Sequence, residues 1–211
     1  MIPLPSRAVN SPRKPPRRFF LQSTLTVARE LIGMHLVHAQ GGQLRRGRIV
    51  ETEAYQGPAD LAAHSARGRT ARTEVMYGPP GHAYVYLIYG FWNCLNVVTA
   101  REGVPHAVLL RALEPIAAMG ARSFGPGLLC RALQVDRALN GADLLGDTLW
   151  LERAPARAAR PRIARATRIG VAYAGAWAAR RWRFFDADSA YVSTARADLR
   201  RRRAAAAADE E

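Results

Sequence analysis

Lysine is almost absent from this sequence of 211 residues, because Lys14 is the only one. It lies in a Pro- and Arg-rich stretch, Ser11–Pro16, that shows no hydrophobic pattern of a packed element. An enzyme that works through a Schiff base needs a lysine or a terminal amine held in its site. Neither group is placed for that role, so the sequence disfavours imine chemistry.

Cysteine is also scarce. Cys94 and Cys130 are too few for a disulfide framework or a four-cysteine zinc site, and we expect both to be buried, reduced thiols. His35 and His38 lie three residues apart, but no other ligand lies near them in the sequence, so we expect both to be structural. The sequence therefore predicts no metal site.

Long hydrophobic runs are missing as well. No apolar run reaches the roughly 18 residues that span a bilayer, and residues 1–18 lack the apolar core of a secretory signal. These residues are acid-free and Arg-rich like an organellar transit peptide, but three prolines within Pro12–Pro16 disfavour the amphipathic helix of such a peptide. We therefore expect no membrane contact and a cytoplasmic location.

Positive charge is present in excess, with 31 Lys and Arg against 17 Asp and Glu, and it is spread unevenly. Residues 1–50 carry nine basic and one acidic side chain, and residues 151–211 carry fourteen and seven. Residues 51–115 carry five and six. A neutral middle between basic flanks suits a reactive pocket surrounded by phosphate contacts. The alternative is that the charge serves only solubility, and composition does not separate the two.

The length and an apolar content of 49% fit one domain with its own core. We expect a flexible basic arm at residues 1–18, a domain over residues 19–195 and a disordered tail at residues 196–211. One modest domain is sufficient by itself, so we expect a monomer.

The predicted elements are mostly strands. A short helix is expected from Thr24 to Ile32 and an apolar helix near Leu128–Val135. The Ala-, Arg- and Pro-rich stretch Arg153–Arg168 is predicted to be a solvated loop, and its role stays open. The expected strands are Met34–His38, Gly47–Tyr55, Ala83–Tyr89, Asn93–Thr99, Ala107–Leu113, Ile169–Tyr173 and Arg183–Asp186. This order predicts an α+β fold, a single domain around a curved, mostly antiparallel sheet with peripheral helices.

One predicted strand concentrates polar groups on one face. Alternation places Glu51, Glu53 and Tyr55 on the same side. Two carboxylates and a phenol are costly to bury without partners, so a functional cleft is a natural explanation. An exposed sheet face whose acids pair with arginines is the alternative.

Tyrosines mark a second strand. Tyr84 and Tyr86 share a face, while Tyr89 points the other way just before a glycine. Tyrosine at strand spacing is usually half-buried core, and we keep that interpretation for Tyr84. Tyr89, at the strand end, suits an aromatic side chain that projects and wedges into a nucleic-acid groove.

Several strings together closely resemble the alkyladenine (3-methyladenine) DNA glycosylase family. The similarity extends from about Phe19 to Ser193 and consists of long, unrelated strings in the right order. These strings are Arg48–Tyr55, Ala63–Ser65, Gly78–Gly90, Asn93–Asn96, Val108–Pro115, Gly125–Cys130, Arg168–Val171 and Trp182–Phe184.

The resemblance implies the chemistry at the matching positions. Glu53 corresponds to the general base that activates water for attack at the sugar C1′. Arg111 matches a residue that helps to hold the water or the backbone near the reacting sugar. Tyr55, His64 and Tyr86 match the residues that sandwich the flipped base.

The resemblance also implies the contacts with DNA. Asn96 matches a pocket residue that penalises the amino group of guanine, and the backbone around Ala54 and His64 reads the base edge. Tyr89 matches the side chain that intercalates from the minor groove. Arg72 matches a phosphate contact, although Thr70–Thr73 here lacks the proline of the usual Thr-Pro-Arg-Asn string, which loosens the loop.

We therefore expect a monofunctional DNA glycosylase that acts on double-stranded DNA in base excision repair and needs no cofactor. The implied substrates are 3-methyladenine, 7-methylguanine, hypoxanthine and ethenoadenine. The lysine content independently supports the absence of an AP-lyase step. Glu51 and Glu53 have a spacing near that of paired glycosidase carboxylates. We do not expect them to act as an acid–base pair, because alkylated purines leave without a strong acid. We expect Glu51 to be structural, anchoring an arginine.

Two other functions stay open. A non-catalytic module that binds lesions or RNA fits the charge and the aromatics equally well, but it needs no carboxylate at Glu53. A glycosidase of free nucleosides needs neither the basic flanks nor a wedge at Tyr89.

Overall fold

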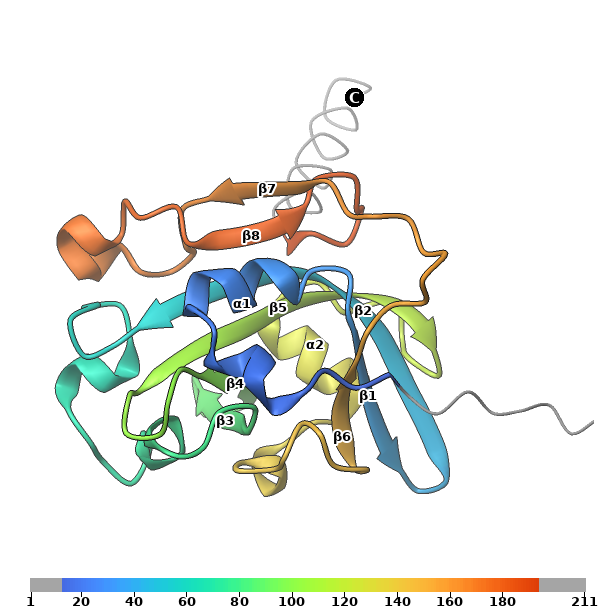
Figure 1. The fold of residues 1–211 in the computed structure, drawn as a ribbon, viewed down its shortest axis with the longest axis horizontal. Helices are drawn as coiled ribbons and strands as arrows, with labels where there is room; N and C mark the ends of the chain where they lie inside the picture. Colours follow the sequence, from blue (N-terminus) through green and yellow to red (C-terminus); the bar gives the residue numbers. More distant parts are fainter. Residues whose placement is uncertain (1–12, 194–211) are drawn as a thin grey trace, which may run out of the picture.

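The computed structural model describes residues 13–193, and one eight-stranded sheet dominates them (Figure 1). Few helices accompany it, which confirms the predicted α+β class. The strands are β1 (His35–Gln40), β2 (Gln43–Gln56), β3 (Ala83–Ile88), β4 (Trp92–Thr99), β5 (His106–Ala117), β6 (Leu149–Glu152), β7 (Ile163–Ala166) and β8 (Arg183–Asp186).

Every strand pair is antiparallel, as expected. The main order is β3-β4-β5-β2-β1-β6, and β8 joins β7 to β2. One edge of the long β2 is shared, because β1 pairs with residues 43–48 and β8 with residues 51–53. The register between β2 and β5 shifts on both sides of Glu51. Such bulges bend a strand, which lets the sheet curl around the core.

The helices are short and peripheral. They are α1 (Thr24–Glu30), α2 (Pro126–Leu133) and the 3₁₀ segments η1 (Arg17–Leu21), η2 (His64–Arg67), η3 (Glu74–Tyr77), η4 (Arg137–Leu139) and η5 (Ala172–Trp177). The Ser23 hydroxyl caps α1 by accepting from the Thr26 amide at 3.1 Å. Pro126 opens α2 at a position where its missing N–H costs nothing. Helix α1 contacts β2, β5 and β8, whereas α2 contacts β4 and β5.

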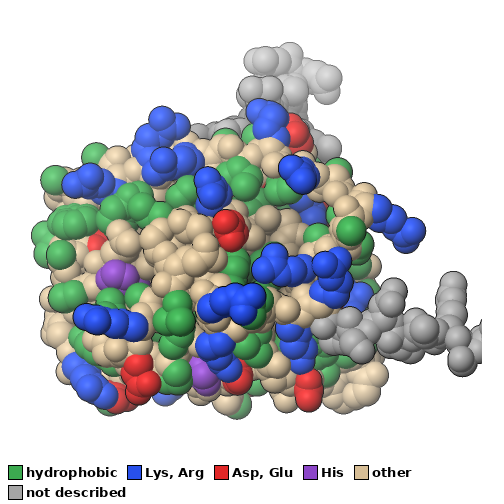
Figure 2. Space-filling model, viewed as in Figure 1, with side chains coloured by type: hydrophobic (Ala, Val, Ile, Leu, Met, Phe, Trp, Pro, Cys, Tyr) green, Lys and Arg blue, Asp and Glu red, His purple; other side chains and the backbone are tan. Residues whose placement is uncertain are grey.

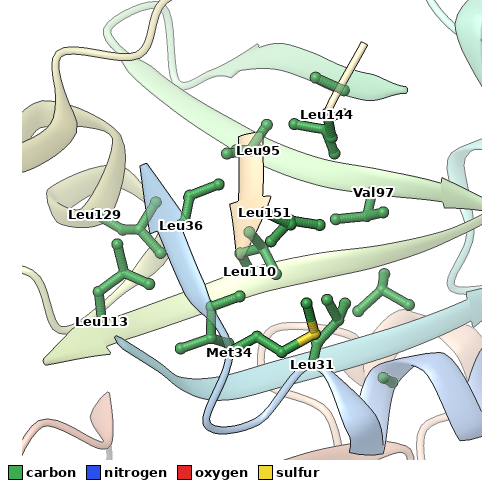
Figure 3. Close-up of a cluster of buried hydrophobic side chains, with 14 of the residues drawn as sticks. Leu31, Met34, Leu36, Leu95, Val97, Leu110, Leu113, Leu129, Leu144 and Leu151 are labelled. Atoms are coloured by element: carbon green, nitrogen blue, oxygen red, sulfur yellow. The ribbon is translucent and has the colours of Figure 1, made fainter. Parts of the chain in front are cut away.

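Leucines from the N-terminal part and from the middle of the sequence meet in the main core (Figure 3). Leu31 and Leu36 come from the N-terminal part, Leu110 from β5, and Leu129 from α2, all without exposed surface. Burying one such side chain contributes about 1.5–3 kcal/mol. This core fixes the sheet on which the polar residues of β2 are mounted.

The segment before β8 differs from the expectation. Ile169–Tyr173 is not a strand, because Gly170 has a φ of +76° that interrupts an extended chain, and η5 begins at Ala172. Arg153–Arg168 is not one solvated loop either, because it contains β7 and ends in the buried Arg168. The Ala/Arg alternation of β7 hid a strand that has one exposed face.

The beginning of the described chain is attached to the domain. The Lys14 ammonium donates to the carbonyls of Leu145 and Gly146 at 3.1 and 2.6 Å, and it pairs with Asp147. These contacts were not anticipated from the sequence. Residues 1–12 of the predicted arm (residues 1–18) and the whole predicted tail (residues 196–211) lie outside the described residues. Across residues 13–193, no helix has the length and apolarity to cross a membrane.

Basic side chains are distributed over the surface rather than gathered in one patch on the face shown in Figure 2. Several of them pair with acids, such as Arg162 with Asp188 and Arg69 with Glu74. Exposed pairs of this kind contribute little to stability, and basic side chains still outnumber acidic ones among the described residues.

Gly127 tests how closely α2 packs on β4. A Cβ at this position would lie 2.7 Å from Trp92 Cε3. Alanine favours helices by about 1 kcal/mol over glycine, but the overlap with the indole outweighs this gain. We expect Gly127→Ala to lower the free energy of unfolding by about 1–3 kcal/mol in urea titrations. Gly120→Ala is the control, because open space surrounds Gly120; equal stability of the two variants would contradict the packing argument.

Candidate active site

A cavity of about 610 Å³ opens beside β3, β4 and β5. Its remaining walls come from the end of β2, the region of η2 and η3, the segment after Arg168 and the first turn of α2. The lining residues are Tyr55, Ala62, His64, Met76, Tyr84, Tyr86, Ile88, Tyr89, Trp92, Cys94, Asn96, Ala107, Leu109, Arg111, Gly125, Pro126, Gly127, Leu128, Ile169, Gly170, Val171 and Tyr173. Its volume is in the range of pockets that hold small molecules.

Aromatic rings form one wall of the cavity. The His64 and Tyr86 ring centroids are 4.5 Å apart and nearly perpendicular, and those of Tyr84 and Tyr86 are 5.3 Å apart. His64 Nδ1 lies 3.0 Å from the Tyr84 hydroxyl. Strand spacing brings the two tyrosines to one face, and η2 brings the histidine against them. Tyr84 is buried core, as expected.

A carboxylate lies behind other residues that line the cavity. Glu53 has no exposed surface, and its three hydrogen-bond donors all line the cavity. The Tyr55 hydroxyl donates to Oε2 at 2.8 Å, Arg111 Nη1 donates to Oε2 at 3.3 Å, and the Ile169 amide donates to Oε1 at 2.8 Å. The carboxylate is thus held in a fixed orientation one layer beneath the cavity.

The bulge in β2 explains why two acids share one arginine. Because the register shifts at Glu51, Arg111 on β5 faces both acids, with Nε 3.4 Å from Glu51 Oε1. Arg183 on β8 approaches Glu51 Oε1 from the other edge at 3.0 Å. The Ser193 amide and hydroxyl also donate to Glu51. The prediction that Glu51 anchors an arginine is confirmed.

Burial and charge act against each other on the pKa values of this cluster. Burial raises the pKa of Glu53 above its ordinary value, while Arg111 and the Ile169 amide oppose the rise. Burial and the neighbouring Glu53 charge raise the pKa of Tyr55 well above its usual range. The phenol therefore stays protonated and serves as a donor to the carboxylate.

His64 is held in its neutral form. Burial, followed by the nearby Arg72 and Arg67 charges, lowers the pKa of His64 to about 4. Arg72 Nη2 lies 3.5 Å from His64 Nε2, and Arg72 Cζ lies 5.0 Å from the centroid of the Tyr86 ring. The histidine is therefore an uncharged ring at neutral pH, suited to stacking.

One aromatic side chain projects from the rim. Tyr89 is 79% exposed at the β3–β4 turn, where its φ is +53°. A positive φ is unusual for a residue with a side chain, and such strain is found most often at functional positions. Phe91 beside it is 67% exposed. The turn thus presents an exposed aromatic pair next to the cavity opening.

The structure brings most of the predicted site residues together. Tyr55, His64, Tyr86, Tyr89, Asn96 and Arg111 line the cavity, and Glu53 lies behind it.

Two predicted residues lie away from the cavity wall. The side chain of Ala54 packs in the main core, its amide donates to Trp182, and its carbonyl accepts from Arg168. Arg72 does not line the cavity but contacts His64 and Tyr86, which do.

Other lining residues carry no chemical signal in the sequence. Ile169, Val171 and Tyr173 read as a strand by hydrophobicity, yet they line the cavity. Gly125–Leu128 lies in one of the strings that resemble the glycosylase family, and only this resemblance indicated that the segment belongs to the site. Among residues 13–193, no group of three or more His, Cys, Asp or Glu side chains is arranged to hold a metal ion.

The fold and the cavity define a class of protein: a single domain around a curled antiparallel sheet, with an aromatic-lined pocket beside a buried carboxylate. Comparisons with known proteins identify the class more closely. Residues 18–190 match the model of the family described as methylpurine-DNA glycosylase.

Bacterial relatives agree with this match. A protein of Anaeromyxobacter dehalogenans (strain 2CP-C) is 54% identical over 181 residues, which cover 85% of this chain and 86% of the relative. Proteins of Legionella pneumophila (strain Corby) and Myxococcus xanthus (strain DK1622) are 50% and 52% identical, covering 86% and 84% of this chain and 98% and 92% of their own lengths. All three are named as 3-methyladenine DNA glycosylases.

This chain therefore belongs to the methylpurine-DNA glycosylase family. It is a DNA glycosylase, a DNA-repair hydrolase that acts on N-glycosidic bonds.

The state of His64 can be measured directly. We expect its NMR titration midpoint at about pH 4, and Arg72→Ala to move it upward because a nearby positive charge is removed. Since the unfolded chain binds more protons between about pH 4 and 6.5, His64 should make stability fall as pH decreases through that window. Arg69→Ala is the control, because Arg69 pairs with Glu74. A midpoint near 6.5 in the wild type would contradict the assigned environment.

Proposed function

We propose that this protein is a monofunctional glycosylase that flips alkylated or deaminated purines out of double-stranded DNA and hydrolyses their N-glycosidic bonds. The substrate class includes 3-methyladenine, 7-methylguanine, hypoxanthine and ethenoadenine. The observation that carries the proposal is the buried Glu53 carboxylate, linked to the cavity wall through Tyr55 and Arg111. The enzyme acts as a monomer in base excision repair and needs no cofactor.

Binding relies on stacking. A base leaves the duplex at a cost of a few kcal/mol, less when it is damaged or mispaired. Contact with Tyr55, His64 and Tyr86 returns about 1–3 kcal/mol for each stacked base. Since every base offers a π-face, this gain does not depend on the surrounding sequence, which suits scattered lesions.

The chemistry uses Glu53 as a general base. The N-glycosidic bond breaks with its electron pair leaving on the purine, and the sugar becomes an oxocarbenium-like cation. A water attacks C1′ and gives its proton to the Glu53 carboxylate, while Arg111 holds the carboxylate toward the sugar. The raised pKa of Glu53 makes it a better base than an exposed carboxylate.

The projecting turn supplies the wedge. Tyr89 enters the duplex from the minor groove and fills the space that the flipped base leaves. Arg72 contributes a phosphate contact from the loop beside the cavity. These two residues stabilise the flipped state without reading sequence.

Asn96 selects among purines. Its Nδ2 donates to the Tyr84 carbonyl at 3.0 Å, so the amide is fixed in one orientation at the cavity wall. We propose that an amide held in this way penalises the exocyclic amino group of guanine. The backbone near Ala54 and His64 contributes to reading the base edge.

The single lysine supports hydrolysis without strand cleavage. The Lys14 ammonium is engaged by the carbonyls of Leu145 and Gly146 and does not line the cavity. A lyase step needs an amine at the reacting sugar. The product is therefore an abasic site in an intact strand.

Glu53→Gln tests the proposed base. We expect single-turnover excision of hypoxanthine from a duplex oligonucleotide to fall by a factor of about 10²–10⁴. The wild-type rate should increase with pH through the pKa of Glu53, which burial raises above the ordinary carboxylate range. Cleavage should require hot alkali, because only an abasic site is formed.

Glu74→Gln is the matched control, since Glu74 is an exposed carboxylate paired with Arg69. If the wild-type protein binds the lesion duplexes but excises none of hypoxanthine, ethenoadenine and 3-methyladenine, the protein is better described as a lesion-binding module. If Glu53→Gln is as fast as wild type, the base is another group.

Tyr89→Ala tests the wedge. Because Tyr89 is exposed, the fold should be unaffected, while lesion-duplex affinity and single-turnover excision should both decrease about tenfold or more. Leu87→Ala, on the same hairpin and 37% exposed, is the control. Unchanged excision by the Tyr89 variant would remove it from the DNA-contacting residues.

A further inference from the structure

Arg168 is a fully buried cation that the proposed mechanism does not use. Its side chain and that of Asp60 have no exposed surface, and the two form an ion pair. Arg168 Nη1 also donates to the Ala54 carbonyl at 3.0 Å, and Nη2 donates to the Trp177 carbonyl at 3.0 Å. One guanidinium thus joins β2, the loop after β2 and η5.

Two aromatic rings enclose this guanidinium. Arg168 Cζ lies 4.8 Å from the centroid of the Tyr55 ring and 5.1 Å from that of Trp182. Tyr55 lines the cavity, whereas Arg168 does not. The cation therefore supports the Tyr55 ring from outside the cavity, in a geometry that only a planar, multidentate group provides.

The next residue connects this cation to the carboxylate. The Ile169 amide, adjacent to Arg168 in the chain, donates to Glu53 Oε1 at 2.8 Å. Tyr55, packed on the cation, donates to Glu53 Oε2. Two of the three donors to Glu53 thus depend on the position of Arg168.

Asp60 shapes the loop that faces Arg168. Its carboxylate accepts from the amides of Gln56 and Ala62 at 3.2 and 3.1 Å, so it closes the turn that follows β2. Ala62 lines the cavity at the end of this turn. The Arg168–Asp60 pair therefore joins two neighbouring segments that line the site, the turn after β2 and the chain that follows Arg168.

Burying the Arg168–Asp60 ion pair costs desolvation free energy, which argues against a purely stabilising role for the pair. Burying an ion pair removes both charges from water, and well-packed apolar residues of similar volume are often as stable. Within the described part of the chain, Arg168 Nε is also buried without a hydrogen-bond partner.

We propose that Arg168, paired with Asp60, is a positioning residue that holds the Ile169 amide and the Tyr55 hydroxyl against the Glu53 carboxylate. This inference rests on the proposed function of Glu53 as the general base. Loss of the guanidinium should let both donors move, which weakens the hydrogen bonds to the ionised carboxylate. Displacements of about 1 Å around a reacting group can reduce rates about 100-fold.

Arg168→Lys is the first variant, because it keeps a positive charge for Asp60 but removes the planar fork and the flat stack on Tyr55. Arg165→Lys is the matched control: Arg165 stacks on Phe184 with Cζ 5.2 Å from the centroid and donates to the Arg181 carbonyl, but it is exposed. Thermal unfolding identifies folded protein. If Arg168→Lys does not fold, the neutral double variant Asp60→Asn/Arg168→Met replaces it.

Two measurements read the position of the Glu53 carboxylate. The first is the pH profile of single-turnover hypoxanthine excision. The second, independent of activity, is the ¹³C NMR titration of the Glu53 carboxyl group. Burial raises the pKa of Glu53. The Arg111 charge and the hydrogen bonds from Ile169 and Tyr55 lower this pKa, and the Glu51 charge raises it. Arg111 and Glu51 stay in both variants, as does Arg183, which pairs with Glu51.

We expect Arg168→Lys to excise at least about tenfold more slowly at the plateau and to shift both the acidic limb and the Glu53 midpoint to higher pH. Arg165→Lys should match wild type in the plateau rate, the acidic limb and the Glu53 midpoint. A folded Arg168→Lys enzyme with wild-type rate and midpoint, or a slower one with unmoved midpoint, would overturn the inference. Absence of excision by wild type would contradict the proposed function alone, and the NMR midpoints would still decide the role of Arg168.

Discussion

The buried charge cluster between β2 and β5 is the constraint on which the site depends. Glu51 and Glu53 have no exposed surface, and two carboxylates are tolerated inside a sheet only when cations and donors meet them. Arg111 contacts both acids because the bulge at Glu51 shifts the register of the strands. Arg183 reaches Glu51 from β8, so the late part of the chain is needed to neutralise the centre of the sheet.

This cluster shows how two acids with different surroundings lie two residues apart. Glu51 is satisfied by Arg183, Arg111 and Ser193, and its full set of partners suits a structural anchor. Glu53 is satisfied from the cavity side, by donors that themselves line the cavity. The same strand face thus holds one acid tied to the protein interior and one acid tied to the wall of the site.

The sequence predicted those features that depend on short-range pattern. Alternation along β2 correctly grouped Glu51, Glu53 and Tyr55, and the tyrosines of β3 were assigned to their faces. The pattern failed at Ile169–Tyr173, because hydrophobic residues that line a cavity look like those of a buried strand. It also failed at Arg168, because an arginine in an Ala/Arg/Pro-rich stretch shows no sign of the distant Asp60 and Trp177 that bury it.

Opposing effects act on the pKa of Glu53, and in the proposed mechanism their balance determines how well it serves as a base. Burial alone would raise the pKa of the carboxyl further and favour its protonated form, and a protonated acid cannot accept a proton from water. Arg111, the Ile169 amide and Tyr55 alone would favour the anion so strongly that it would be a weak base. Burial remains the larger effect, so the pKa is raised while the donors keep it from rising further. In the proposed mechanism, any residue that fixes these donors therefore also influences the pH range in which Glu53 accepts a proton, whether or not that residue touches the base.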